Sequence, residues 1–172
     1  MKKTLVFSQI LGFIFTSIAG VILHFLYDWT NQNAFIAAFS AVNESTWEHM
    51  KLLFFPMFIY ALIQRRYKGK EYKNFWCVKL IGIVLGLLLI PGLYYTINGA
   101  FGITPDWVNI AIFFVTAGIC YFVETKLFEM GINCKSQGIA LLILWLIALV
   151  FVIFTFIPLS IPLFEDPTQY LN

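Results

Sequence analysis

Long apolar runs separated by short polar segments are the feature of this sequence that most restricts its fold. An α-helix needs about 20 apolar residues to cross a hydrocarbon core of about 30 Å. Runs near that length occur at residues 4–27, 46–64, 75–95, 108–128 and 138–157. The sequence therefore predicts an all-α integral membrane protein, a helical bundle with about five transmembrane helices.

Composition supports one membrane-embedded domain that covers residues 1–172. Hydrophobic residues make up 60% of the chain and charged residues 12%, whereas about a quarter of the residues are charged in a typical soluble domain. Lys2 and Lys3 precede a run that is too long for a signal peptide, so we expect a first transmembrane helix there. Residues 34–42 are apolar but too short to span, and we expect an interfacial or re-entrant segment.

The basic residues predict the orientation, because loops on the cytoplasmic side are enriched in Lys and Arg. With the N-terminus inside and the C-terminus outside, ten of the eleven basic residues lie on the cytoplasmic side, and Lys51 is the exception. We therefore expect a multi-pass protein of the cytoplasmic (inner or cell) membrane, with the basic loop 65–73 in the cytoplasm. Two of the three cysteines fall near this reducing side, so we expect three free thiols and no disulfide.

The second expected helix carries charges at its outer end. Ser45 and Glu48 have the spacing of a capping box, which predicts a helix start. The strictly apolar part, residues 52–63, rises only about 18 Å and falls about 12 Å short of the bilayer core. Glu48, His49 and Lys51 must then lie at the outer boundary of the membrane. Since charges facing lipid are costly, we expect these side chains to point into the bundle.

The first expected helix has a matching polar face. Gly12, Thr16 and Gly20 are small residues that allow close helix packing. His24 and Asp28 continue this face and reach the depth of Glu48. On the inner side, the third and fourth helices carry Lys79 and Glu124, for which we expect separate snorkelling in preference to an ion pair.

Several chemistries fit the polar residues at the outer end. Imidazole and carboxylate groups suit zinc, iron or manganese, so the candidate ligands of a divalent metal are His24, Glu44, Glu48 and His49. Glu48, His49 and His24 are also candidates for catalytic acids and bases. No spacing here matches a known metal motif. The alternative is structural: Glu48 caps the helix and pairs with Lys51, Asp28 ends the first helix, and the histidines are interfacial hydrogen-bond donors.

Aromatic residues near the outer helix ends have a simple explanation. Trp29, Trp47, Trp107, Tyr94 and Tyr95 fall where a membrane-interface belt would place them. We expect such a belt in preference to an aromatic ligand pocket.

The stretch VNESTWEHMKLLFFP resembles the signature VNESxWEHxKLxFxP of a family of small bacterial multipass membrane proteins, described only as a domain of unknown function. The resemblance runs along the whole chain, with His24 in the first helix and a terminal PLFxDP pattern that begins at Pro162. It implies a fold and a location but no activity. The candidate ligand-binding residues that it singles out are Asn43, Glu44, Trp47, Glu48, His49 and Lys51, to which the first helix adds Asp28.

Three hypotheses follow for the function. The first is a protein that binds or transports a cation, a proton or a small polar ligand at the outer leaflet ends of the first two helices. The second is a membrane-embedded enzyme, with or without a divalent metal cofactor, that acts on a lipid or envelope intermediate. The third is an accessory or assembly protein. Membrane lipids are the expected partners, a net charge of +2 argues against nucleic acid, and the sequence identifies no protein partner.

Overall fold

The computed structural model describes residues 2–68, 71–102 and 106–167, and within these ranges the regular structure is helical. The helices are α1 (Lys2–Trp29), α2 (Ala34–Ala37), α3 (Thr46–Lys68), α4 (Phe75–Phe101), α5 (Asp106–Met130), α6 (Gln137–Phe156) and the 3-10 helix η1 (Pro162–Phe164). The prediction of an all-α bundle is confirmed.

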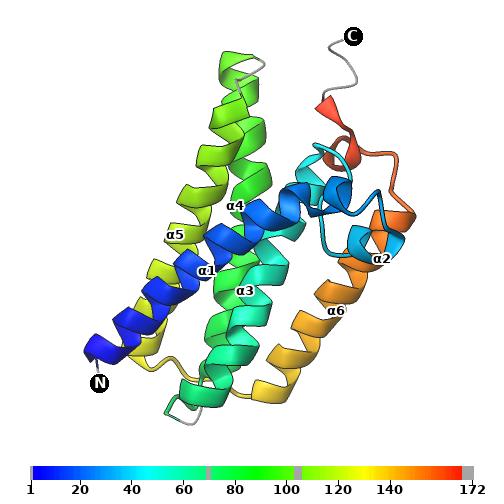
Figure 1. The fold of residues 1–172 in the computed structure, drawn as a ribbon. Helices are drawn as coiled ribbons and strands as arrows, with labels where there is room; N and C mark the ends of the chain where they lie inside the picture. Colours follow the sequence, from blue (N-terminus) through cyan, green and yellow to red (C-terminus); the bar gives the residue numbers. More distant parts are fainter. Residues whose placement is uncertain (1, 69–70, 103–105, 168–172) are drawn as a thin grey trace.

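The five long helices alternate in direction, so α1 begins at one end of the bundle and η1 lies at the other (Figure 1). Helix α1 crosses the bundle obliquely and packs against α3 and α5, while α4 packs against α3, α5 and α6. Five traverses place the beginning of α1 and the end of α6 at opposite ends, as the sequence predicts.

Four helices in the described part of the chain are long and apolar enough to cross a membrane: Lys3–Trp29, Phe75–Phe101, Trp107–Met130 and Gln137–Phe156. Their outer faces expose large apolar side chains such as Phe7, Leu88, Phe122 and Leu146. Extended apolar surface of this kind is typical of contact with lipid. The lengths, composition and exposed faces of these helices are those of a membrane protein.

Helix α3 is not among these four, and the predicted count of five spans depends on it. Its 23 residues rise about 34 Å, which is long enough to cross a bilayer. Its side chains are mostly buried between α1, α4 and α6, and the exposed ones are Ile59, Leu62, Ile63, Arg66 and Tyr67. A helix that faces protein needs fewer apolar residues than one that faces lipid. This environment explains how α3 tolerates the charged turn that its sequence carries.

The small residues of α1 allow close packing, as predicted. A Cβ atom on Gly12 would lie 2.5 Å from both Tyr60 on α3 and Tyr121 on α5. Gly20 is covered in the same way by the ring of Phe113 on α5. The two glycines therefore permit aromatic rings from neighbouring helices to rest on the backbone of α1.

Residues 34–42 fold back against the bundle. The carbonyl oxygen of Ala37 accepts a hydrogen bond from Lys51 Nζ at 2.8 Å. The ring of Phe39 packs on Phe55, with centroids 5.0 Å apart, and Phe55 lies about 14 Å along α3 from its first residue. These contacts hold residues 34–42 against the first three turns of α3.

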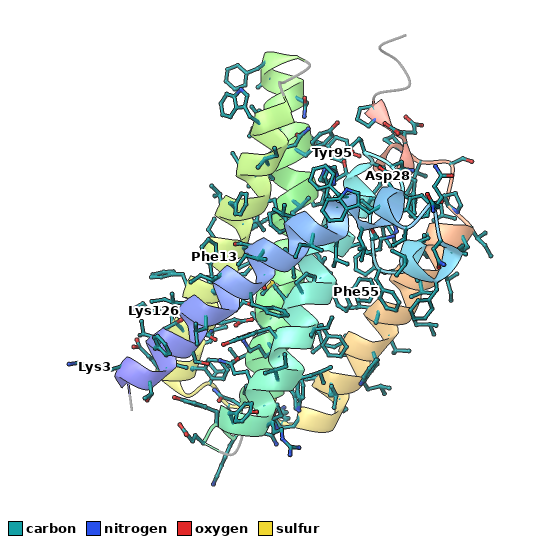
Figure 2. All side chains as sticks on the ribbon, viewed as in Figure 1. Lys3, Phe13, Asp28, Phe55, Tyr95 and Lys126 are labelled. Carbon is teal, nitrogen blue, oxygen red and sulfur yellow. A yellow bond between two sulfur atoms is a disulfide. The ribbon has the colours of Figure 1, made fainter. Side chains whose placement is uncertain are left out.

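Basic residues gather where α1 begins and α3 and α5 end, here called the basic end. It holds Lys3, Arg65, Arg66 and Lys126, while Asp28 lies toward the opposite, upper end (Figure 2). The clustering at one end agrees with the charge segregation predicted from the sequence.

The prediction of three free thiols is wrong. Cys77 and Cys134 form a disulfide, with Cα atoms 6.0 Å apart, and Cys120 is free and buried. The two bonded cysteines are 57 positions apart, and the packing of α4 against α6 brings them together. No local spacing in the sequence signals this contact.

Alkylation should detect this disulfide. We expect one cysteine to be alkylated when the purified protein is unfolded without reductant, and three after reduction, because Cys77 and Cys134 are blocked until the bond is cleaved. Intact mass spectrometry counts the modified residues. Three modifications without reductant would contradict the pairing. A bond that persists in cells would argue against a cytoplasmic basic end, since stable disulfides are rare on the reducing side.

Candidate functional site

Two histidines and one glutamate converge at the upper end of the bundle. Glu44 Oε1 lies 3.6 Å from His24 Nε2, and Glu44 Oε2 lies 3.6 Å from His49 Nε2. One ligand atom from each residue falls within 4.8 Å of the other two. The histidines are partly buried, whereas 46% of the Glu44 side chain is exposed. These three residues are called the His–Glu cluster.

A tight turn before α3 positions Glu44. Asn43 Oδ1 accepts a hydrogen bond from the Ser45 N–H at 3.0 Å, and Ser45 Oγ accepts from the Glu48 N–H at 3.4 Å. The serine half of the predicted capping box is therefore present. In a full capping box, the Glu48 carboxylate would also accept from the Ser45 N–H. Here it accepts from the Val42 N–H at 3.0 Å, and the Ser45 N–H donates to Asn43. The turn is bonded on both sides of Glu44.

Hydrogen bonding determines the tautomer of His49. Its Nδ1 lies 2.9 Å from the carbonyl oxygen of Ser45. A carbonyl oxygen can only accept, so Nδ1 carries the proton. In the neutral ring, Nε2 then has a free lone pair that faces the carboxylate of Glu44, and both groups are acceptors. This pairing is favourable only with positive charge between or on the two groups, which is supplied by a proton on the imidazole or by a bound cation.

Glu48 and Lys51 lie apart from the His–Glu cluster. Lys51 is fully buried, with Nζ 2.6 Å from Glu48 Oε2. It also donates to Ala37 O at 2.8 Å and to Thr155 Oγ1 on α6 at 2.9 Å. Glu48, proposed from the sequence as a metal ligand or a catalytic residue, is thus held by this pair. The observed arrangement is the structural alternative in which Glu48 pairs with Lys51.

Trp47 and Asp28 also lie outside the cluster. Trp47 is buried and stacks on Phe164 of η1, with ring centroids 4.6 Å apart. The expectation of a membrane-interface belt is therefore wrong for Trp47, because η1 and α6 cover it, while Trp29 and Trp107 are exposed. The contact between Trp47 and Phe164 joins the VNESTWEHMKLLFFP stretch to the terminal PLFxDP pattern, the two stretches that carry the family resemblance. Asp28 is exposed at the end of α1.

An apolar pocket of about 150 Å³ adjoins the His–Glu cluster. Its lining residues come from α1, α3 and α5: Gly20, Val21, His24, Phe25, His49, Leu52, Asn109, Ile110, Phe113 and Phe114. Within the described part of the chain, His24 Nδ1 and Asn109 Oδ1 are buried without a hydrogen-bond partner. Asn109 was not predicted from the sequence. The feature that could have indicated it is a single amide side chain near the start of an otherwise apolar helix.

A second polar cluster occupies the half of the bundle nearer the basic end. Lys79 Nζ on α4 lies 2.5 Å from Glu124 Oε2 on α5, and both side chains are almost completely buried. Gln9 Nε2 on α1 donates to the same oxygen at 3.0 Å, and Gln64 Nε2 on α3 donates to Gln9 Oε1 at 2.9 Å. The expectation of separate snorkelling is wrong, because both residues face the interior, where an unpaired charge is more costly than a paired one.

Comparisons with known proteins identify a family but no activity. A family model described as a family of unknown function (DUF6512) matches residues 2–170, so the chain belongs to this family. No curated protein and no solved structure matches. The function must therefore be inferred from the chemistry of the two polar clusters.

Proposed function

We propose that this member of the DUF6512 family binds a divalent metal ion at the His–Glu cluster, in the upper end of a membrane-spanning bundle. The observation that carries the proposal is the convergence of His24 Nε2, His49 Nε2 and the Glu44 carboxylate within 4.8 Å. Ligand atoms on one tetrahedral zinc ion lie about 3.4 Å apart, close to the two 3.6 Å separations from Glu44. A bound cation would also compensate the facing acceptors of His49 and Glu44.

The ligand set suits zinc, iron or manganese. Three protein ligands leave at least one coordination position for water or a solute, as in metal sites that bind an exchangeable ligand. The hydrogen bond from His49 to Ser45 supplies the outer-shell support that metal-bound histidines usually have. The exposure of Glu44 gives an ion access from the upper end.

We further propose that the basic end faces the cytoplasm of a bacterial cell and that the His–Glu cluster opens on the outer side of the cell membrane. This orientation places Cys77 and Cys134 on the reducing side, so it requires that their disulfide is reduced in the cell. The support is the gathering of Lys and Arg residues at one end of the bundle, which is typical of cytoplasmic loops. With this orientation, the cluster binds ions from outside the cell.

Zinc binding by purified protein in detergent tests the proposal. We expect one zinc per chain. Loss of a residue that only supports a metal ligand weakens metal binding by about 10–100-fold, and we expect Glu44→Ala and His49→Ala, which remove ligands, to weaken it further. Isothermal titration and elemental analysis measure affinity and stoichiometry. Asp28→Asn, which removes an exposed carboxylate one turn beyond His24, is the matched control. Equal zinc affinity in all four proteins would refute the site.

The apolar pocket favours a second candidate, an enzyme that acts on a lipid. Val21, Phe25 and Ile110 line the pocket and are themselves exposed on the membrane-facing surface. An acyl chain could enter between α1 and α5 while its head group meets the metal. Phospholipid retained only by the zinc-loaded protein, detected by native mass spectrometry, would favour this candidate. Zinc binding that leaves lipid retention unchanged would favour ion binding alone.

A further inference from the structure

Polar side chains with buried oxygen or nitrogen atoms occur at intervals between the upper end of the bundle and the Lys79–Glu124 pair. On α5 they are Asn109, Thr116 and Glu124, spaced seven and eight residues apart and so about two helical turns from one to the next. Helix α1 contributes Ser17 and His24, and α3 contributes Gln64. These six residues are called the polar file.

The polar file is unusual because each of its side chains has one buried polar atom without a hydrogen-bond partner. Seven buried side-chain oxygen or nitrogen atoms lack a partner within the described ranges, and six belong to the polar file. They are Ser17 Oγ, His24 Nδ1, Gln64 Oε1, Asn109 Oδ1, Thr116 Oγ1 and Glu124 Oε1. Buried polar atoms are normally bonded to protein or to ordered water. The six residues come from α1, α3 and α5, which contact one another, and their unpartnered atoms favour bound water.

The contact between the antiparallel helices α1 and α5 adds two hydroxyl groups. Thr16 Oγ1 and the Tyr121 hydroxyl are 2.8 Å apart, near the middle of the two helices. Closer to the basic end, Gln9 contacts Glu124 at 3.0 Å. Hydroxyl groups both donate and accept hydrogen bonds, so they can relay a proton between water molecules.

Hollows lie at both ends of this α1–α5 contact. At the upper end, the 150 Å³ pocket includes His24 and Asn109, and a cavity of about 20 Å³ beside Asn109 has room for one water molecule. Toward the basic end, a groove of about 420 Å³ runs from Lys126 and Glu129 to Gln9 and Tyr121. The Phe113 ring resting on Gly20 and the Tyr121 ring resting on Gly12 separate the two.

The buried charges of Lys79 and Glu124 restrict which ions could pass along this path. Lys79 Nζ lies within 6 Å of the ring centres of Tyr60, Phe75, Tyr121 and Phe128, and the carboxylate that it contacts is that of Glu124. Its ammonium group would repel a divalent cation. A carboxylate linked to hydroxyls and water is instead the arrangement found in intramembrane proton relays.

We propose that the polar file is a proton pathway between the upper end and the basic end, with Glu124 as its central carboxylate. Water molecules and the hydroxyl, imidazole and carboxylate groups each accept a proton from one neighbour and pass one to the next, so one proton enters for each that leaves, while the Asn109 and Gln64 amides bind water by hydrogen bonds. The groups that face Glu124 are Lys79 from α4, Gln9 from α1, and Tyr121 and Cys120 from α5. Tyr60 from α3 completes these surroundings. The pathway does not require the metal site.

Proton flux into proteoliposomes tests the pathway. The protein is reconstituted into vesicles that contain a pH-sensitive dye, and potassium efflux through valinomycin drives proton entry and balances the charge. We expect faster acidification with the wild-type protein than with protein-free vesicles. We expect Glu124→Gln to lower the rate to that of protein-free vesicles, because the relay loses its carboxylate.

Thr116→Val separates conduction from folding. Valine keeps the shape of threonine, and the Thr116 hydroxyl has no hydrogen bond to the described part of the protein, so the variant should fold as the wild type does. We nevertheless expect slower proton entry, because the middle of the polar file loses a hydroxyl. Asp28→Asn, a carboxylate change outside the polar file, should conduct as the wild type. Wild-type flux equal to that of protein-free vesicles, or unchanged flux in both Glu124→Gln and Thr116→Val, would overturn the proposal.

Discussion

Lys79→Met should destabilise the protein by about 3–5 kcal/mol, the usual effect of removing one partner from a buried ion pair. Lys79 and Glu124 are 1% and 0% exposed, and their charged atoms are 2.5 Å apart. The substitution leaves the Glu124 carboxylate in the interior with the Gln9 amide as its remaining donor. Unfolding by denaturant in mixed micelles measures the loss.

Two companion variants show whether the pair is responsible. Lys126→Met removes a lysine that also pairs with a glutamate, since its Nζ lies 3.6 Å from Glu129 Oε2. More than half of the Lys126 side chain is exposed. It should cost no more than about 1 kcal/mol. The double variant Lys79→Met/Glu124→Leu removes both charges and should recover most of the lost stability. Equal losses in Lys79→Met and Lys126→Met would show that the buried pair does not stabilise the fold.

The helical fold was predictable because lipid imposes a strong constraint on sequence. Runs of apolar residues gave the four helices that face the membrane, to within a few residues at most ends. Helix α3 was harder to interpret, because its charged turn and short apolar part conflict with the usual rule for a span. Its burial among other helices resolves this conflict, and burial depends on tertiary packing that hydropathy does not encode.

Part of the candidate site was predictable for a local reason. The turn at Asn43 and Ser45 follows from side chains that bond their near neighbours, and the helical spacing of α1 brings His24 to the same depth. Glu48 was harder to assign, since the sequence allows it either to join the histidines as a ligand or to pair with Lys51 three residues away. The choice depends on Ala37 and Thr155, which complete the donor contacts of Lys51 and come from distant segments.

Contacts between distant segments account for the remaining errors. Lys79 and Glu124 are 45 positions apart, and Cys77 and Cys134 are 57 apart. Neither pair has a sequence spacing that implies contact. Each partner taken alone fits a common pattern, a snorkelling charge or a free thiol, so reasoning from single residues favoured the wrong outcome.

Lys51→Met should also destabilise the protein by about 3–5 kcal/mol, and it should weaken metal binding although Lys51 is not a ligand. Lys51 Nζ joins three segments through Glu48, Ala37 and Thr155. Glu48 in turn accepts from the Val42 N–H, at the beginning of the turn that carries Glu44. Loss of the lysine frees Glu48 and loosens this turn. Unfolding in micelles and zinc titration measure the two effects.

The double variant Lys51→Met/Glu48→Leu separates these effects. Removing both buried charges should restore most of the stability. Zinc affinity should stay low, because replacing Glu48 removes the acceptor of the Val42 N–H. Lys79→Met/Glu124→Leu, a matched double change near the basic end, should recover stability and bind zinc as the wild type. Full zinc affinity in Lys51→Met/Glu48→Leu would show that Glu48 is not needed to position Glu44. The hydrogen bonds of Asn43 and Ser45 would then be sufficient to position it.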